Sequence, residues 1–351
     1  MPKRKDCSRS PPLTEASKRV ELDPEALQEN PPVEKYTVGW ICALQEEYET
    51  ACRMLDYELE GPEINEANDD NTYVFGSVSG HHVVVGCLPT GRYGTNSAAR
   101  VASDMVRSFP NLRFALMVGI GGGAPTADRD IRLGDVVVSQ PNEDFGGVIQ
   151  YDLGKKLSDR FERVGQLNAP PGVLLGVIPE MQRHHNDPRK PDRLAEHLKR
   201  MDDMQTYRRP KEDYLYCTNY QEHGRKSCGQ CGPAGLVQRQ VRHSHRTVTV
   251  HYGTIASGNS VIKDARTRDG YANDSKLKIL CFEMEAAGLM NNFPCLVIRG
   301  VSDYSDSQKN DNWHKYAALT AAAYARELLF VLKPRKVGAM PQWAGRLAKS
   351  K

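Results

Sequence analysis

The sequence predicts an α/β fold with a mostly parallel sheet that helices cover on both faces. Apolar segments such as YTVGWICAL (36–44) do not alternate with polar residues, which is typical of strands buried on both faces. Segments with apolar residues at helical spacing, such as QEEYETACRMLD (45–56), lie between these strands. A further buried strand is predicted in FALMVGIGGGAP (114–125), and we interpret the glycines that follow FALMV as a flexible backbone loop. This alternation is the pattern of layered α/β domains.

The remaining elements follow in the same order. NTYVFGSVSGHHVVVGCLP (71–89) predicts two strands about a glycine-containing turn, and SAARVASDMVRSF (97–109) predicts an amphipathic helix. The alanine-rich segment 315–332 predicts a closing helix. Four more strands are predicted at 133–139, 248–258, 277–283 and 294–303.

We expect one domain over residues 36–335. The segment 150–247 breaks the strand and helix rhythm, is rich in Pro, Arg, His and Tyr, and contains a helix near LAEHLKRM (194–201), so we interpret it as a peripheral insertion. Residues 1–35 lack apolar periodicity and predict a disordered leader. Residues 336–351 predict a flexible tail.

Composition excludes several classes of protein. The 351 residues include 47 Lys+Arg and 44 Asp+Glu, which gives a net charge of +3 and argues against nucleic acid as a partner. No run approaches the ~20 apolar residues of a membrane span, and no secretory signal is visible. Nine cysteines, several of them in apolar runs, suit reduced thiols and a cytoplasmic location. The basic cluster 3–5 has two readings, a nuclear address and a solubilising tail.

Polar residues follow the predicted strands where ligands bind in such folds. They are Glu46 and Glu47, the glycines Gly119 and Gly121 to Gly123, Glu283 and Glu285, and Ser302 and Asp303. Carboxylates converging on one crevice suit acid/base chemistry on a small polar molecule. Each has a plainer reading: acidic residues are favoured at helix starts, and Asp303 can cap a turn.

Two segments of the sequence match cofactor motifs only in part. GIGGGA (119–124) fits the dinucleotide fingerprint, but Pro125 and a polar segment follow where a helix is required. The insertion contains one Cys-x-x-Cys pair with nearby potential ligands, namely Cys217, His223, Cys228 and Cys231. A single pair favours an incidental or locally structural role over zinc. We therefore expect no cofactor and no metal.

Six segments in this order resemble the purine nucleoside phosphorylase / methylthioadenosine nucleosidase superfamily, in the version common in fungal proteins. They are VGWICALQEEY, MVGIGGGAP, LGDVVVS, IASGNSVIKD, FEMEAAGLM and VIRGVSD. The resemblance implies a three-layer αβα fold with a central mixed, twisted sheet. It also implies cleavage of the N-glycosidic bond of a nucleoside and assembly into a homo-oligomer.

The resemblance assigns roles by position. Asp303 would assist the departing purine at N7, and Glu285 would accept hydrogen bonds from the ribose hydroxyls. Arg299 would support the site. The other implied substrate-binding residues are Ser302, which orients Asp303, Met284 under the sugar, Val261 and Ile262 at the base, and Gly121, Gly122 and Leu44.

The attacking group separates two hypotheses. Met117 and Ile120 stand where bacterial phosphorylases carry phosphate ligands, and Glu47 falls on the water-activating glutamate of the nucleosidases, so the resemblance favours hydrolysis. Arg92 is the main objection, because it could contact phosphate from its loop. The alternatives are therefore a purine nucleosidase, a purine nucleoside phosphorylase, and a weakly catalytic nucleoside-sensing module. Ordinary purine ribonucleosides are the expected substrates, with Trp313 and His314 near the ribose 5′ end.

Overall fold

The computed structural model describes residues 30–218, 235–242 and 245–343. The chain divides into two units, Met1–Asn30 and Pro31–Lys351, and the fold described here lies within the second. Most of the predicted leader, residues 1–29, lies outside the described residues, while Val33–Lys35 form the short 3-10 helix η2.

A mixed sheet of ten strands forms the centre of the described part of the chain. Its middle consists of β1 (Val38–Cys42), β5 (Phe114–Gly123) and β12 (Cys295–Asp303), which pair in parallel. The strand order is β11-β10-β6-β12-β5-β1-β4-β3-β2, with β7 pairing to β10. The outer strands are β2 (Tyr57–Leu59), β3 (Tyr73–Val78), β4 (His81–Cys87), β6 (Val136–Ser139), β7 (Val148–Gln150), β10 (Val250–Ser257) and β11 (Ile279–Glu283). The pairs β6–β12, β3–β4, β2–β3 and β11–β5 are antiparallel, so the predicted mixed α/β sheet is confirmed.

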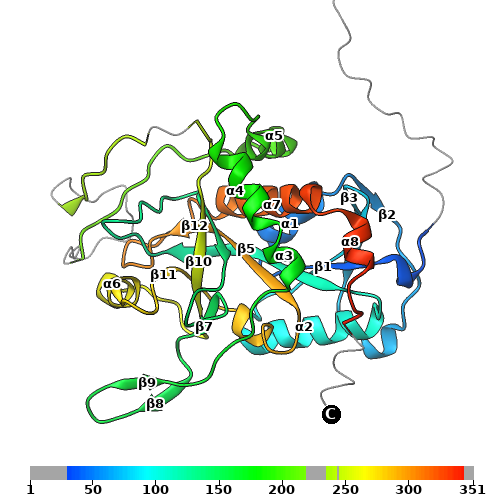
Figure 1. Ribbon diagram of the computed structural model, residues 1–351, viewed down its shortest axis with the longest axis horizontal. Helices are drawn as coiled ribbons and strands as arrows, with labels where there is room; N and C mark the ends of the chain where they lie inside the picture. The colour runs from blue at the N-terminus through cyan, green and yellow to red at the C-terminus, as the bar shows by residue number, and fades with distance from the viewer. Residues whose placement is uncertain (1–29, 219–234, 243–244, 344–351) are drawn as a thin grey trace, which may run out of the picture. The chain divides into compact units, whose positions relative to one another are not determined.

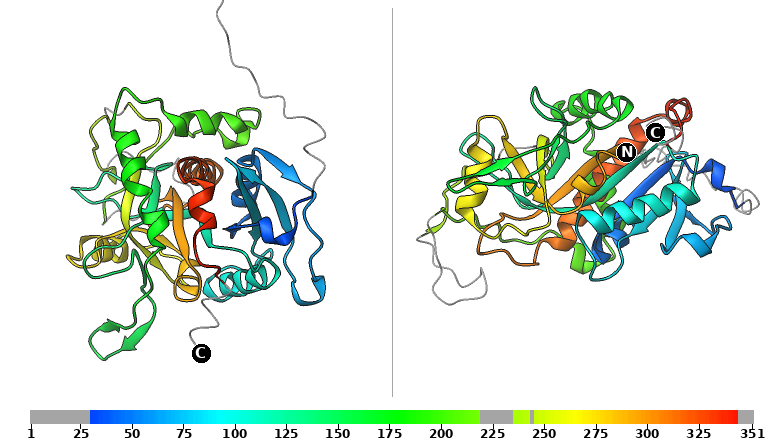
Figure 2. Two further views of the ribbon diagram at one scale, coloured as in Figure 1. Left: turned by 45° about the vertical axis from the view of Figure 1, so that its right-hand side comes forward. Right: turned by 90° about the horizontal axis from the view of Figure 1, so that it is seen from below.

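Helices cover both faces of this sheet, as the non-alternating apolar strands predicted (Figures 1 and 2). On β5, Ala115 and Met117 belong to one buried cluster with α2 (Thr95–Ser108). Leu116 and Val118 belong to the other cluster, with α1 (Gln45–Arg53) and α7 (His314–Val331). The remaining helices are α3 (Gly172–Leu175), α4 (Ile178–Asn186), α5 (Arg193–Leu198), α6 (Ala265–Asn273) and α8 (Pro334–Gly338), with 3-10 helices η3 (Glu66–Asn68), η4 (Lys199–Met201), η5 (Gln205–Tyr207) and η8 (Ala286–Gly288).

The glycine run is part of a strand, and the prediction of a loop there is wrong. Residues up to Gly122 pair with β12 on one side, and Gly122 and Gly123 pair with β11 on the other. Glycine is required because a side chain at Gly119 would collide with Glu47 and Arg299. The run therefore lets polar side chains of neighbouring elements approach the β5 backbone.

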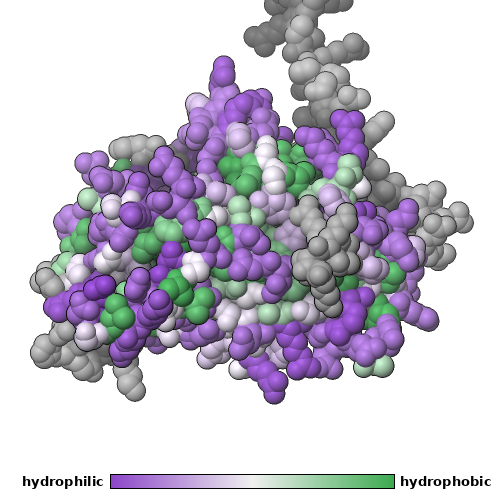
Figure 3. Space-filling view, turned by 60° about the horizontal axis from the view of Figure 1, so that its bottom comes forward, coloured by the Kyte–Doolittle hydropathy of each residue, from purple (hydrophilic) through white to green (hydrophobic). Residues whose placement is uncertain are grey.

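The segment 150–247 contains α3, α4, α5 and a two-stranded hairpin. The hairpin strands, β8 (Gly154–Lys156) and β9 (Phe161–Arg163), extend away from the sheet (Figures 1 and 2). The exposed large apolar residues of this hairpin and its flanking residues are Leu153, Leu157, Phe161 and Val164. Figure 3 shows that on the face it presents, hydrophobic residues form small separate patches among hydrophilic ones.

Residues 336–343, which the sequence predicts to be part of a flexible tail, include the end of α8 and a buried tryptophan, Trp343. α8 ends at Gly338, and the Trp343 side chain is buried against Phe293. Its backbone N–H donates to the carbonyl of Leu112, and its indole N–H donates to the carbonyl of Asn292. Burial of one large aromatic side chain outweighs the polar character of its neighbours, which is why composition misjudged this segment.

No helix among the described residues is long and apolar enough to cross a membrane.

Candidate active site

A cavity of about 200 Å³ lies where β1, β5, β11 and β12 end. Twelve residues singled out from the sequence line it, namely Leu44, Glu47, Ile120, Gly121, Gly122, Val261, Ile262, Glu283, Met284, Glu285, Ser302 and His314. We call it the nucleoside cavity, after the resemblance. Sequence reasoning missed several of its other lining residues: Ala43, Tyr93, Ser260, Phe282, Ser305 and Lys309.

Glu47 is held rigidly at the start of α1. Its Oε2 accepts hydrogen bonds from the backbone N–H groups of Ala43 (2.7 Å) and Leu44 (3.1 Å), and its Oε1 accepts one from Ile120 on β5 (2.8 Å). A carboxylate accepts about four hydrogen bonds, so these three leave one acceptor position on Oε1. That position is available to a molecule in the cavity.

Arg299 joins three carboxylates beneath the cavity. Its guanidinium is fully buried in β12, donates to Glu283, and lies 3.2 Å from Oε2 of Glu285. Glu47 adds to the negative charge around it. The other oxygen of Glu285 accepts from the backbone N–H of Gly94 (3.3 Å). One buried cation therefore organises the acidic half of the site.

Burial is the main cause of the altered acidity here. It raises the pKa of Glu285 to about 7, with Arg299 opposing this and Glu283 adding to it. Burial also raises the pKa of Glu47, against the opposing charge of Arg299 and the backbone hydrogen bonds. A carboxylate with a raised pKa is a stronger base, which suits proton abstraction from water.

Asp303 is not among the residues that line this cavity, but it accepts hydrogen bonds from three residues that do. Its Oδ1 accepts from the backbone N–H of Ser305 (2.8 Å), and its Oδ2 accepts from the Ser302 hydroxyl (2.9 Å) and the Lys309 ammonium (2.7 Å). These three partners all line the nucleoside cavity. The Asp303 carboxylate itself lines a second cavity of about 240 Å³.

The second cavity shares Ser302 and Lys309 with the first. Part of its wall comes from the 150–247 segment, through Pro210, Lys211, Glu212 and Tyr214. The Asp303–Lys309 ion pair therefore stands between two cavities.

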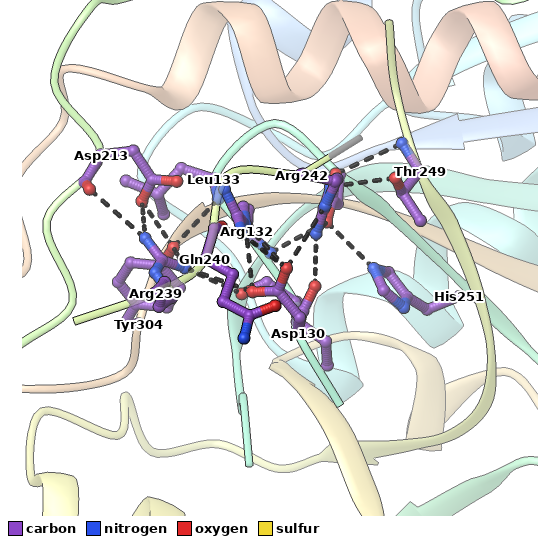
Figure 4. A network of polar contacts seen from close by, with 12 residues as sticks. Asp130, Arg132, Leu133, Asp213, Arg239, Gln240, Arg242, Thr249, His251 and Tyr304 are labelled. Atoms are coloured by element: carbon purple, nitrogen blue, oxygen red, sulfur yellow. Dashed lines mark hydrogen bonds and ion pairs between the residues drawn. The ribbon is translucent and has the colours of Figure 1, made fainter. Parts of the chain in front are cut away.

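The residue after Asp303 is tied to the same segment (Figure 4). The Tyr304 hydroxyl donates to Asp213 (2.5 Å) and accepts from Arg239 (2.8 Å) and from the backbone N–H of Leu133 (3.3 Å). Arg239 also donates to Asp213 (2.8 Å). These contacts hold the side chain of Tyr304, the residue that follows the candidate acid Asp303, in place.

A second part of this network holds the loop before β6. Buried Asp135 accepts from both terminal nitrogens of Arg242 (2.7 and 2.9 Å) and lies 2.9 Å from His251 on β10. Although burial opposes it, these cationic and hydrogen-bonding partners hold the pKa of Asp135 below its ordinary value. Segment 150–247 thus packs against the site side of the sheet through charged contacts.

Other predicted residues lie in different places. His314 lines the nucleoside cavity, while Trp313 lines the second one and donates its indole N–H to the carbonyl of Glu212. Arg92 is exposed and is not among the lining residues.

Most residues of the possible zinc site lie outside the described residues. His223, Cys228 and Cys231 lie outside them, and the described part of the chain contains no cluster of three or more His, Cys, Asp or Glu suited to a metal. Cys217 is exposed, and Cys42, Cys281 and Cys295 are buried free thiols.

The chain belongs to the phosphorylase superfamily, which it matches over residues 37–330. It is 46% identical over 305 residues to a nucleotide-binding leucine-rich repeat (NLR)-like protein of Hyaloscypha variabilis, which covers 86% of this chain. The chain spans 30% of the length of that relative. It is 24% identical over 302 residues to the 5′-methylthioadenosine/S-adenosylhomocysteine nucleosidase of Mycobacterium bovis, covering 84% of this chain and 96% of the relative.

Among solved structures, the fold resembles a 5′-methylthioadenosine/S-adenosylhomocysteine nucleosidase of Neisseria meningitidis in complex with methylthio-immucillin-A. The TM-score is 0.52 at 17% sequence identity, over 84% of this chain and 99% of that one. At this identity the likeness concerns the fold.

The raised pKa of Glu285 predicts a pH-dependent stability. Glu285 binds its proton more tightly in the folded chain (pKa about 7) than at its ordinary value of 4.5, so this contribution is complete below pH 4.5 and is lost as the pH rises through about 7. We expect the free energy of unfolding of the wild type, minus that of Glu285→Gln, to fall by roughly 3 kcal/mol between about pH 4.5 and pH 8. Urea denaturation across this range measures it.

The control is Glu63→Gln, which changes an exposed carboxylate. It should change the free energy of unfolding by less than about 0.5 kcal/mol, as surface substitutions usually do. A difference between the wild type and Glu285→Gln that does not change with pH would show that Glu285 binds its proton no more tightly in the folded chain than in the unfolded chain.

Proposed function

We propose that this protein hydrolyses the N-glycosidic bond of purine ribonucleosides. The observation that carries the proposal is Glu47, a buried carboxylate with a raised pKa and one open acceptor position at the wall of the cavity. In this mechanism Glu47 takes a proton from water as the water attacks the sugar carbon. Glu285 accepts hydrogen bonds from the ribose hydroxyls, and its negative charge favours the oxocarbenium-like transition state.

The base occupies the other end of the cavity in this proposal. Glu47 accepts a hydrogen bond from the backbone N–H of Ile120, and Asp303 pairs in register with Gly122, which lies two residues or roughly 7 Å further along β5. This spacing lets one carboxylate act at the sugar and the other at the purine. Val261, Ile262 and Phe282 supply apolar surface for the base.

The positively charged side chains near the cavity favour hydrolysis over phosphorolysis, because they are already paired with carboxylates. No arginine is among the described residues that line the nucleoside cavity, and Arg299 behind it is engaged by carboxylates. Lys309 is paired with Asp303. A phosphate ion would therefore meet few free positive charges and several negative ones, at a cost in Coulomb energy.

Product analysis tests the proposal. The purified protein is incubated with adenosine, inosine, guanosine or 5′-methylthioadenosine, each with and without phosphate, and the products are separated by chromatography. We expect free base and ribose without phosphate, and a loss of about 100-fold or more in Glu47→Gln, which keeps the size of the side chain but cannot accept the proton.

Two results would contradict the proposal. Base release that requires phosphate and yields ribose 1-phosphate would establish a phosphorylase and direct attention to Arg92. Nucleoside binding without turnover would favour a sensing module, the third hypothesis, to which the NLR-like relative gives some weight.

A further inference from the structure

The contacts of Asp303 raise the question of where the proton for the departing purine comes from. A purine leaves far more readily when a proton is delivered to it in the transition state. Asp303 accepts hydrogen bonds from three donors, one of them the ammonium group of Lys309 at 2.7 Å. In such an ion pair the proton resides on the lysine nitrogen, so the resting carboxylate is an acceptor and has none to give.

We propose that Lys309 is the source of the proton that leaves with the purine, transferred to the base across Asp303. The inference rests on the proposed nucleoside hydrolysis and assigns one further residue to it. Among the partners of the Asp303 carboxylate, the Ser305 amide and the Ser302 hydroxyl are far weaker acids than an ammonium group. Lys309 is therefore the strongest acid among the three partners.

The transfer balances in protons and electrons. One N–H bond of the Lys309 ammonium breaks, the proton reaches Oδ2 of Asp303, and Asp303 passes a proton to a ring nitrogen of the base. The bond between the sugar carbon and the base breaks with its electron pair on the base, while water adds to the carbon and gives its proton to Glu47. Afterwards Glu47 releases one proton to solvent and Lys309 takes one up.

The second cavity provides the place where Lys309 regains its proton. Lys309 lines both cavities, and its side chain is 22% exposed whereas that of Asp303 is 3% exposed. A bound nucleoside would fill the first cavity and leave the second open. Lys309 is therefore the member of the pair that keeps contact with water during turnover, on the side walled by residues 210–214.

A purely positioning role for Lys309 makes a different prediction. If the ammonium only orients Asp303, an arginine should replace it, because a guanidinium also carries a positive charge and N–H donors. A guanidinium does not release its proton in proteins. The variants Lys309→Arg and Lys309→Met therefore separate positioning from proton supply.

The experiment measures kcat and KM of both variants with two substrates. One is the best purine nucleoside found for the wild type, and the other is 4-nitrophenyl β-D-ribofuranoside, whose leaving group departs as a stable phenolate without a proton. We expect both variants to lose about 100-fold or more in kcat on the nucleoside, with KM changed little. On the nitrophenyl riboside they should stay within about threefold of the wild type, whereas Glu47→Gln loses activity on both substrates.

Each alternative result is decisive. Recovery of the nucleoside kcat in Lys309→Arg, an equal loss on both substrates, or no loss in Lys309→Met would each overturn the inference. If the wild type does not cleave the nitrophenyl riboside, the comparison of the arginine and methionine variants decides alone. Wild-type protein that cleaves neither substrate would instead refute the proposed hydrolysis.

Discussion

Replacing Asp303 by asparagine is expected to lower kcat/KM for the purine nucleoside by about 10²- to 10⁴-fold. Asparagine matches the size of the side chain but can neither accept a proton from Lys309 nor pass one to the base. Its amide group also replaces a carboxylate oxygen facing the Lys309 ammonium, so the ion pair is lost as well. Steady-state kinetics with chromatographic detection of the free base measures the change.

Asp159→Asn is the matched control. Asp159 lies between the hairpin strands β8 and β9, and its side chain is 66% exposed and lines neither cavity. We expect its kinetics to stay within about twofold of the wild type, since exposed charge changes away from a site have small effects. Near-normal activity of Asp303→Asn would mean that the base departs without help from this carboxylate, and would also remove the basis for proton transfer from Lys309.

The sheet was predictable because burial on both faces leaves a strong mark in the sequence. Strands β1 and β5 contain no polar side chain, and β12 is apolar from Cys295 to Ile298, so these side chains fit the core whichever face they point to. The cavity was predictable for the same reason. Once these strands are parallel, residues such as Glu47 and Ser302 must meet at one end of the sheet.

The glycine run shows what periodicity cannot predict. Consecutive glycines have no side chains that could show which face of a strand is buried. They are typical of loops and also of places where another group approaches the backbone closely. Here Gly119 and Gly122 make room for Glu47 and Asp303, which come from elements far away in the sequence. Only the paired neighbours on both sides identify this run as a strand.

The contact between Lys309 and Asp303 could not be predicted from the sequence, for a related reason. It lies in the polar segment after β12, where any of several charged or amide residues could have turned toward Asp303. A six-residue separation in an irregular loop fixes no geometry, so sequence spacing gives no preference for Lys309 over its neighbours. Tyr93, which is 60% exposed and still lines the cavity, carries no apolar periodicity signal either.

Removing the positive charge of Arg299 should have the largest effect on stability. In Arg299→Met, Glu283 and Glu285 lose their buried partner, and Glu47 loses the charge that opposes the rise in its pKa. Breaking a buried ion pair by removing one partner costs about 3–5 kcal/mol, because the remaining charge stays buried. We expect a loss of this size in the free energy of unfolding at neutral pH, measured by urea denaturation. The loss should be smaller at pH 5, because Glu47 and Glu285 have raised pKa values and are protonated to a larger extent there.

Two further variants make this prediction sharp. Arg100→Met removes the cation of an exposed pair with Asp70, for which surface ion pairs predict at most about 1 kcal/mol. The double variant Arg299→Met/Glu283→Gln should be more stable than Arg299→Met alone, because it removes one of the carboxylates left without a cation. If the double variant is no more stable than the single one, the loss comes from packing of the arginine side chain, and Arg299 is not the charge that holds the acidic residues of this site together.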